Sequence, residues 1–492
     1  MTLVEKEIAG SGPTLIYEKS VTGRTGFTLP SLKTDKKQIL ASIPNEFLRC
    51  SDAALPEVTE GEAMRHFVGL SVKNHHIEKG FYPLGSCTMK YNPKLNDAAA
   101  SFSGFKERHP LAPCSSAPGF LELMWRLKLC LSEISGFPSI SLQPVAGAHG
   151  EFAGLLIMRA CHQASGQKRD RIIIPDSAHG TNPASVSSVG FTTTQIKSGP
   201  NGIIEPDAVR AVMADDVAGM MLTNPNTLGI FETHIAEIAA IVHEGGGLMY
   251  MDGANLNANM GIFRPGDVGF DMMHFNLHKT FSTPHGGGGP GAGAIGVTAE
   301  LDKFLPFPVL SQSPGGGLFF DYARPDSIGR LHSFYGNFGN IVRAYAYIRS
   351  LGGDGLRRVS EAAVLNANYL KEMLRDDYEL PYDCHCMHEF VISGSVQKKL
   401  GVKTSDISKR LLDFGVHSPT NYFPLIVPEA MMIEPTETEN RETLDQFAAV
   451  MKQIAHEARD NPDLVKSAPY TTPVRRLDEA GAIRNMDVSY KE

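Results

Sequence analysis

The pattern of apolar and polar positions divides the chain into an irregular first part, a long alternating middle and a smaller last part. Residues 1–55 mix Gly, Pro, Lys and Asp without periodicity. They predict an extended arm that lies on a partner surface, with disorder as the alternative. Apolar residues at helical spacing predict a helix over 57–73 and an amphipathic helix over 116–134.

Between residues 141 and 297, short apolar runs alternate with helical segments. After a first strand beginning at Ser141, strands are predicted at 171–175, 191–196, 217–222, 247–251 and 292–297. Helices are predicted between them at 151–165, 206–213 and 232–243. This alternation predicts a mostly parallel sheet covered by helices, in an α/β fold. Ligands of such sheets bind beyond the carboxyl ends of the strands.

The last part of the chain predicts a smaller α+β unit. A long helix over 340–351 is expected to continue from 355 to 374, and the smaller unit follows it. Its predicted elements are a strand at 390–393 and helices at 405–414 and 439–459. We therefore expect an N-terminal arm and first helix at 1–75, a large domain at 76–338, a small C-terminal domain at 339–460 and a surface tail at 461–492.

Composition narrows the class of protein. The chain has 492 residues, 42% of them hydrophobic, and a net charge of −8, which argues against nucleic acid as the main partner. No apolar run approaches the roughly 20 residues that span a bilayer, so we expect no membrane partner. The first residues lack the layout of a secretory signal. Seven scattered cysteines do not form a disulfide framework, and a cytoplasmic location is expected.

Candidate catalytic residues follow the predicted strands. His179, Asn224 and Asp252 each lie just past a strand end, and Lys279 follows the next apolar run. A pyridoxal-phosphate enzyme needs a carboxylate that keeps the pyridinium nitrogen protonated and a lysine that holds the aldehyde as an imine. Such a lysine must lose its proton, which burial and nearby cations favour. Taken singly, Asp252 is equally a helix N-cap, and a satisfied polar histidine or a surface lysine is the simpler interpretation. Their order along the chain favours the cofactor site, with His179 stacked on the ring.

Further residues could complete such a site. Gly147, Ala148 and His149 stand at the start of a helix, where free amides and the helix dipole bind phosphate. Many strand-to-helix turns contain glycine, so this signal is weak alone. Asn224 and Thr227 could hydrogen-bond the ring oxygen of the cofactor or the substrate.

Two loops carry unusual residues. After Lys279, four glycines at 286–289 precede Pro290, and their amides can approach a ligand closely. The loop 80–93 is rich in turn formers, and a solvated surface loop is an equal interpretation of it. An inert thiol is the better interpretation of Cys87, because no base for it is identifiable. The loop residues that could reach a polar ligand are Tyr82, Ser86, Thr88 and Lys90.

Three other features are less specific. The segment 384–388 has soft ligands, but its spacing matches no common zinc site, and we predict no metal. The acidic segment 434–439 predicts a solvated turn and helix cap rather than a site for a basic partner. Cations that could meet a carboxylate or phosphate are Arg324, Arg330, His332 and Arg343.

Several of these stretches closely resemble the glycine decarboxylase (P-protein) family of the glycine cleavage system. The matching motifs are Asp176-Ser-Ala-His-Gly-Thr-Asn-Pro-Ala184, Met251-Asp-Gly-Ala-Asn255 and Asn276-Leu-His-Lys-Thr-Phe281 with its Pro-His-Gly-Gly-Gly-Gly-Pro-Gly tail, supported by Leu84–Lys90 and His388-Glu-Phe390. The resemblance covers about residues 80 to 460. The length is similar to that of the second subunit of the two-subunit form, which carries the cofactor lysine.

The resemblance implies a fold-type I pyridoxal-phosphate enzyme that decarboxylates glycine and passes the aminomethyl group to the lipoyl disulfide of the H-protein. It implies that Lys279 is the Schiff-base lysine, Asp252 the pyridinium partner and His179 the stacking residue. His278 and the glycine loop would lie against cofactor and substrate, and Asn255 belongs to the same set. Since the chain lacks the first half of single-chain P-proteins, a separate glycine dehydrogenase subunit 1 and an α2β2 assembly are expected.

Two alternatives stay open at this point. The chain could be a stand-alone fold-type I amino-acid decarboxylase or aminotransferase. It could also be a catalytically idle scaffold, although a scaffold has no physical need for Lys279 or Asp252.

Overall fold

The computed structural model describes residues 14–51, 53–109, 111–286 and 291–489. The chain forms two compact units, one made of Met1–Gly80 and Tyr470–Glu492 and the other of Phe81–Pro469. The glycines at 287–289 and Pro290, predicted to approach a ligand, lie outside the described residues. Among the described residues, no helix combines the length and the apolar character needed to cross a bilayer.

The first unit holds short helices joined by irregular chain. Its longest helix, α3, begins with a capping box between Thr59 and Glu62, so it starts later than the predicted residue 57. Two of its apolar residues, Met64 and Phe67, are more than half exposed. The helices of this unit are α2 (Lys36–Ala41), α3 (Glu60–Ser71) and α17 (Glu479–Arg484).

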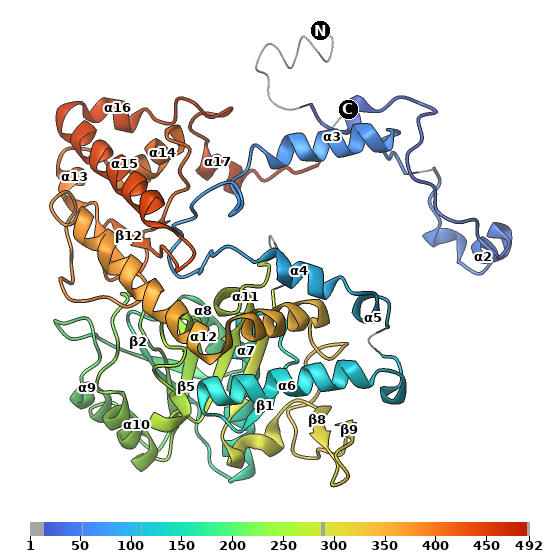
Figure 1. Ribbon diagram of the computed structural model, residues 1–492, viewed down its shortest axis with the longest axis horizontal. Helices are drawn as coiled ribbons and strands as arrows, with labels where there is room; N and C mark the ends of the chain where they lie inside the picture. The colour runs from blue at the N-terminus through green and yellow to red at the C-terminus, as the bar shows by residue number, and fades with distance from the viewer. Residues whose placement is uncertain (1–13, 52, 110, 287–290, 490–492) are drawn as a thin grey trace. The chain divides into compact units, whose positions relative to one another are not determined.

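A seven-stranded sheet organises the second unit (Figure 1). The strands β2 to β6 pair in parallel, and β7 pairs antiparallel with β6 and with β1. The predicted mostly parallel sheet is therefore confirmed. In spatial order the strands are β1 (Ser139–Ser141), β7 (Gly293–Val297), β6 (Met272–Asn276), β5 (Leu248–Gly253), β4 (Val217–Thr223), β2 (Arg171–Pro175) and β3 (Thr192–Ile196).

Helices cover both faces of this sheet. Ile173 of β2 packs in one cluster with α6, α10 and α12, whereas Ile172 and Ile174 pack in another with α7 and α8. Successive strand residues point to opposite faces, so neither face is left to water. Figure 1 shows α6 and α12 in front of the sheet. The helices here are α4 (Lys94–Ala100), α5 (Ser103–Lys106), α6 (Pro118–Ser135), α7 (Gly147–Ala164), α8 (Thr181–Ser188), α9 (Pro206–Arg210), α10 (Ile235–Glu244) and α11 (Leu277–Thr280).

Helix α7 begins at Gly147 rather than at the predicted residue 151, because it lies directly on the sheet. A Cβ atom on Gly154 would lie 2.1 Å from Cε2 of Tyr250, and one on Gly150 would lie 2.7 Å from Cβ of His274. Glycine at these positions allows the close approach. The glycines that suggest a turn in the sequence are therefore part of the helix.

The rest of the second unit packs around its own core. Helix α12 (Phe338–Leu374) is two helices joined at Gly352, whose φ of 66° is not helical, as the break in the sequence pattern predicts. A small antiparallel sheet follows, and the boundaries predicted at 338 and 460 stay a prediction. The remaining elements are β8 (Val309–Gln312), β9 (Leu318–Asp321), β10 (Phe390–Ser393), β11 (Thr420–Asn421), β12 (Ala430–Ile433), α13 (Ser395–Lys399), α14 (Thr404–Asp413), α15 (Arg441–Asp460) and α16 (Pro462–Lys466).

Candidate active site

A cavity of about 240 Å³ lies at the carboxyl ends of the parallel strands. Thr223 ends β4 and Asn276 ends β6, and both line it. Such edges are where open α/β sheets bind ligands. The predicted site residues that line this cavity are Lys279, Asp252, His179, His278, Thr227, Asn255, Gly147 and Ala148.

Asp252 is a buried carboxylate with three polar neighbours. Its Oδ1 accepts from the amide of Ala254 at 2.9 Å and lies 3.2 Å from Nε2 of His274, and its Oδ2 accepts from Nδ2 of Asn182 at 3.0 Å. Burial alone would raise the pKa of Asp252, but His274, then Asn182 and Lys279, outweigh it and hold the pKa below its usual range. The side chain is therefore ionised at neutral pH.

Sheet register explains how His274 comes to face Asp252. The two residues are direct partners in the parallel pairing of β5 with β6. On the other side of the ring, Nδ1 lies 2.9 Å from the hydroxyl of Tyr250, which donates to the carbonyl of Gly150 at 3.2 Å. This buried chain of polar groups fixes the orientation of the carboxylate, because each member is held by the next.

Lys279 extends from α11 towards a loop that comes from far away in the sequence. Its Nζ donates to the carbonyl of Ser86 at 2.9 Å. The loop departs from ordinary backbone geometry, since Ser86 and Thr88 have φ values of 66° and 46°. Ser86 also lines the cavity. Of the four loop residues predicted to reach a polar ligand, Ser86 is thus at the site, beside the amine.

The ring of His179 is fixed by its own loop. Nδ1 of His179 accepts from the amide of Thr181 at 3.2 Å and lies 2.9 Å from its hydroxyl, which donates to Glu151 at 2.9 Å. Burial lowers the pKa of His179, so its imidazole is neutral at neutral pH. A fixed, neutral ring at the cavity wall is suited to stacking on a flat ligand.

The start of α7 offers a place for an anion. In the part of the chain that the structure describes, no side chain caps this helix at Ala146, so its first amides are unpaired by side chains. A Cβ atom on Gly147 would lie 2.3 Å from Oδ1 of Asn276, so this wall accepts only glycine without rearrangement. Oδ1 of Asn276 and Oγ1 of Thr223 are buried and have no hydrogen-bond partner among the described residues. Unpaired buried polar atoms are costly and point to a polar ligand.

Three more predicted residues line the cavity, and each is held by contacts with neighbouring residues. His278 places Nδ1 2.9 Å from the carbonyl of Ala292, and burial lowers its pKa to about 4. Thr227 donates its hydroxyl to the carbonyl of Ser177. Asn255 donates to the carbonyl of Pro225 at 2.8 Å and to Glu389 at 3.1 Å.

Asn224 and His149 do not line this cavity. The Oδ1 of Asn224 accepts from the amide of Glu232 at 3.0 Å, and its carbonyl accepts from Asn259 at 2.9 Å. These contacts fix the chain after β4. Nδ1 of His149 accepts from the amide of Val145 at 3.3 Å, and burial, followed by His332, lowers its pKa.

The sequence does not predict several of the residues that line the cavity. Glu151 accepts hydrogen bonds from the hydroxyls of Thr181 and Ser185. Asn276 is the last residue of β6, and Thr223 is the last residue of β4. A polar residue that ends an apolar strand is the signal that could have found the last two. None of the predicted cations Arg324, Arg330, His332 and Arg343 lines the cavity formed by the described residues.

The prediction for the acidic segment 434–439 is wrong at its start. Glu434 is 0% exposed and Thr436 is 1% exposed, so this is not a solvated turn. The segment is covered because the loop containing Thr88 and Lys90 packs against it. The side chain of His388 is likewise buried, with its Nε2 3.8 Å from Oε1 of Glu434.

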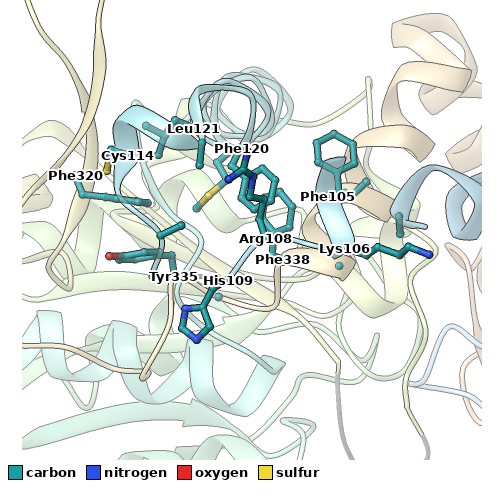
Figure 2. Close-up of a pocket in the computed structure, with 17 residues that line it drawn as sticks. Phe105, Lys106, Arg108, His109, Cys114, Phe120, Leu121, Phe320, Tyr335 and Phe338 are labelled. Carbon is teal, nitrogen blue, oxygen red and sulfur yellow. The ribbon is translucent and has the colours of Figure 1, made fainter. Parts of the chain in front are cut away.

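A second cavity, also of about 240 Å³, has a different character (Figure 2). Aromatic rings dominate its lining, and Lys106 points away from them. It contains no carboxylate among the described residues, so it lacks a partner for a pyridinium nitrogen. The rings are those of Phe105, Phe120, Phe320, Tyr335 and Phe338.

Two known families match parts of the chain. Residues 359–469 match the family described as glycine dehydrogenase, C-terminal domain. Residues 150–311, which include Asp252 and Lys279, match the aminotransferase class-V family.

Full-length relatives give a closer match. The chain is 55% identical to the probable glycine dehydrogenase (decarboxylating) subunit 2 of Chloroherpeton thalassium, over 97% of each chain. It is 56% identical to the protein of the same name from Lysinibacillus sphaericus, over 97% of this chain and 99% of the relative. The crystal structure of a glycine decarboxylase (P-protein) of the glycine cleavage system in inhibitor-bound form superposes with a TM-score of 0.72 at 18% identity, covering 85% of this chain and 95% of that one. The last match establishes the fold, which is that of fold-type I pyridoxal-phosphate enzymes.

Proposed function

The chain belongs to the family of glycine dehydrogenase (decarboxylating) subunit 2, and we propose that it is the cofactor-bearing subunit that decarboxylates glycine. In this proposal the aminomethyl group passes to the lipoyl disulfide of the H-protein. The observation that carries it is the presence of Lys279 and the ionised Asp252 in one cavity at the strand ends.

The residues present fit pyridoxal 5'-phosphate. Lys279 offers an amine for the aldehyde, Asp252 a buried carboxylate for the ring nitrogen and His179 a flat neutral ring. The uncapped start of α7 at Gly147 offers amides for the phosphate. The unpartnered atoms of Asn276 and Thr223 are further evidence that a polar ligand belongs here. When bound, this cofactor supplies an electron sink for the pair that carbon dioxide leaves behind.

Each residue has a definite task in this scheme. Asp252 keeps a proton on the ring nitrogen, since a carboxylate whose pKa is held low by His274 does not take that proton itself. Ser86 orients Nζ of Lys279 through its carbonyl. His179 and His278 are both neutral at neutral pH because burial lowers their pKa values, so neither repels a cationic amine group of the substrate.

Transfer to the H-protein balances the electrons of decarboxylation. The bond between the α-carbon and the carboxylate breaks, carbon dioxide leaves, and the electron pair of that bond forms the new bond between the aminomethyl carbon and one sulfur of the lipoyl group. The S–S bond breaks, and its electron pair stays on the other sulfur, which takes up a proton and becomes a thiol. The H-protein, glycine and a separate first subunit in an α2β2 assembly in the cytoplasm are parts of the proposal.

Visible absorption tests the cofactor and its anchor. After incubation with pyridoxal phosphate, the native chain should show a yellow band that borohydride bleaches, and Lys279→Ala should lack it. Lys128→Ala is the matched control, because burial lowers the pKa of Lys128 to about 8 and makes it a reactive amine outside this cavity. Loss of the band in the control, with retention in Lys279→Ala, contradicts the assignment.

Exchange of labelled carbon dioxide into glycine tests the partner. It should require lipoylated H-protein and the first subunit. Decarboxylation of other amino acids by the chain alone would favour the stand-alone decarboxylase instead.

A further inference from the structure

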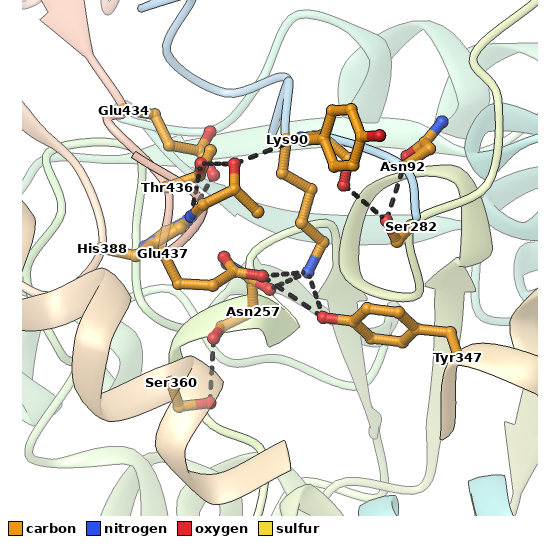
Figure 3. Close-up of polar contacts among 12 residues, drawn as sticks. Lys90, Asn92, Asn257, Ser282, Tyr347, Ser360, His388, Glu434, Thr436 and Glu437 are labelled. Carbon is orange, nitrogen blue, oxygen red and sulfur yellow. Dashed lines mark hydrogen bonds and ion pairs between the residues drawn. The ribbon is translucent and has the colours of Figure 1, made fainter. Parts of the chain in front are cut away.

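Two buried carboxyl groups stand behind the loop that touches Lys279. Glu389 directly precedes β10 and Glu434 directly follows β12, and both are 0% exposed. The antiparallel register pairs Phe390 with Ile433, which brings the two glutamates next to each other at one end of the small sheet. Figure 3 shows Glu434 and His388 beside the polar network that surrounds Lys90.

Each glutamate accepts one backbone amide of the loop. Ser86 donates to Oε2 of Glu389 at 2.7 Å, and Thr88 donates to Oε2 of Glu434 at 2.8 Å. These two loop residues are the ones with left-handed backbone conformations. A residue with a side chain holds such a conformation only where its surroundings impose it. The two carboxyl groups supply that constraint.

The constraint reaches Lys279 through a single peptide. Glu389 fixes the amide of Ser86, and the carbonyl of the same residue accepts from Nζ of Lys279 at 2.9 Å. Glu389 also accepts from Asn255 at 3.1 Å, and Asn255 lines the same cavity. Glu389 therefore connects one wall of the cavity to the carbonyl that orients the amine.

Hydrogen-bond donors show how the pair divides one proton. Both oxygens of Glu389 accept from N–H donors, which favours the ionised form. The Oε1 of Glu434 has no hydrogen-bond partner among the described residues, and it lies 3.8 Å from Nε2 of His388, which has none either. At 3.8 Å the two atoms are too far apart for a hydrogen bond. The absence of an N–H donor at Oε1 among the described residues is what favours the protonated form of Glu434.

Electrostatics agrees with one proton for the pair. Burial, followed by the charge of Glu434, raises the pKa of Glu389 well above its usual range, and burial raises the pKa of Glu434 to about 7. Burial and charge alone would thus place the shared proton on Glu389, and it is the N–H donors at both oxygens of Glu389 that assign the proton to Glu434. Two ionised carboxylates this close are unfavourable in a dry site. Burial lowers the pKa of His388 to about 3, so its ring is neutral and can accept. The other charged groups that face the pair are Lys279 from α11, Lys90 from the loop and Glu437 from the segment after β12.

We propose that Glu389 and Glu434 are positioning residues for Lys279, acting as a carboxylate and a neutral carboxyl group that together hold residues 84–88 against the amine. The importance of these two glutamates for catalysis rests on the proposed function. The geometry predicts different effects for the glutamine variants of the two residues, because glutamine resembles a neutral carboxyl group. Glu434→Gln keeps an acceptor for Thr88 and remains uncharged. Glu389→Gln must turn an NH₂ group towards one of two N–H donors.

Amide hydrogen exchange of the full chain measures the loop without any cofactor. At pH 6.5, we expect Glu389→Gln to lower the protection of the Ser86 and Thr88 amides about tenfold or more, because a charge-assisted hydrogen bond is lost. Glu434→Gln should keep it within about twofold. The matched control is Glu429→Gln, another buried glutamate, which accepts from Thr404 at 2.9 Å and should leave these two amides unchanged.

The pH profile gives a readout that a merely structural role would not move. In the native chain, protection corrected for intrinsic exchange should fall as pH rises from about 4.5 to about 7, because the closed loop keeps a proton on Glu434 that the opened, solvated loop releases. In Glu434→Gln it should stay level over the same range. Equal loss of protection in both glutamine variants, no loss in either, or the same fall with pH in the native chain and Glu434→Gln overturns the proposal. The last comparison decides even if Glu389→Gln does not fold.

Two further measurements distinguish this proposal from the proposed function and from a metal site at the same residues. Borohydride trapping of pyridoxal phosphate on Lys279 at pH 6.5 should be slowed about tenfold by Glu389→Gln and unaffected by Glu434→Gln. A native chain that traps no cofactor contradicts the proposed function, while the exchange data still decide on the pair. Because His388, Glu389 and Glu434 are close enough to share an ion, one equivalent of metal that Glu434→Gln loses would overturn the assignment of the proton.

Discussion

Replacing Lys90 by methionine tests how firmly the loop over the active site is anchored. Lys90 is buried, with its Nζ donating to Glu437 at 2.9 Å, Asn257 at 2.8 Å and Tyr347 at 3.1 Å (Figure 3). Burial alone would lower the pKa of Lys90, but Glu437 and then Tyr347 outweigh it and raise the pKa. Methionine has a similar length and no charge, so Lys90→Met removes the ammonium group while filling most of the space.

The magnitude follows from what the substitution leaves behind. At 2.9 Å and an effective dielectric constant of about 20, the attraction between Lys90 and Glu437 is about 6 kcal/mol. Desolvation of the two ions offsets much of this, but removing one partner leaves a buried charge, which typically costs about 3–5 kcal/mol. Asn257 and Tyr347 still donate to Glu437, at 3.1 and 3.3 Å. We therefore expect the low end, about 3 kcal/mol.

Local amide exchange is the suitable assay, because a chain with two compact units does not unfold in one step. The amides of Thr88, Lys90 and Tyr91 are hydrogen-bonded within the loop or across to residues 434–438. Their exchange should accelerate about 100-fold in Lys90→Met. Adding Glu437→Gln should restore at least a tenfold part, because no buried charge is then left unpaired.

An exposed ion pair provides the control. Arg126→Met breaks a solvated pair with Glu122 and should change these amides less than twofold. Acceleration below threefold in Lys90→Met, or a double variant that exchanges as fast as the single one, would show that the ion pair between Lys90 and Glu437 does not anchor the loop.

Three further predictions concern the site itself. Asp252→Asn should lower the rate of exchange between glycine and carbon dioxide about 10²- to 10³-fold, and a rate within tenfold of native contradicts the role of the carboxylate. Gly147→Ala should weaken cofactor binding, measured by absorption titration, about tenfold or more, because its Cβ would lie 2.3 Å from Oδ1 of Asn276; Gly119→Ala, which meets nothing within 4 Å, should have no effect. The native chain should lose up to about 3 kcal/mol of stability as pH rises from 4.5 to 7, because the folded state holds a proton on Glu434 up to a pKa of about 7. Glu434→Gln should remove that part of the slope, measured by the exchange of the slowest amides of the unit Phe81–Pro469, and parallel slopes in the two proteins contradict the assignment.

The central sheet is readable from the sequence where strands are short, apolar and separated by helices. The strand predicted at 171–175 has the observed bounds, because isoleucines fill it and Pro175 closes it. The polar residue after the apolar run 247–251 identifies Asp252 as a candidate without any knowledge of the tertiary structure, although β5 continues to Gly253 and includes Asp252. Since parallel strands end at the same edge, their order along the chain is enough to bring this carboxylate and Lys279 to one cavity.

The second half of the site depends on contacts that no local pattern records. In the sequence, Glu434 resembles part of a solvated acidic turn. In the structure it accepts a hydrogen bond from the amide of Thr88, 346 residues earlier in the chain. Composition describes the surroundings a residue has in its own segment, and an acidic segment is normally solvated. Only the packing of the loop against the small sheet excludes water here. For the same reason, the burial of Lys90 could not be predicted from its own segment, because its partner Glu437 is distant in the sequence.

Strand register accounts for both of the charged clusters near Lys279. Pairing of β5 with β6 sets Asp252 against His274, and pairing of β10 with β12 sets Glu389 beside Glu434. In the two proposals made above, the first cluster sets the charge presented to a ligand, and the second holds the loop that orients the amine. The small antiparallel sheet therefore contributes to the active site through its strand ends, although none of its strands lines the cavity that the described residues form. A substitution that shifts the register of β10 by one residue would turn Glu389 to the opposite face and release Ser86, although no residue that lines the cavity would itself be substituted.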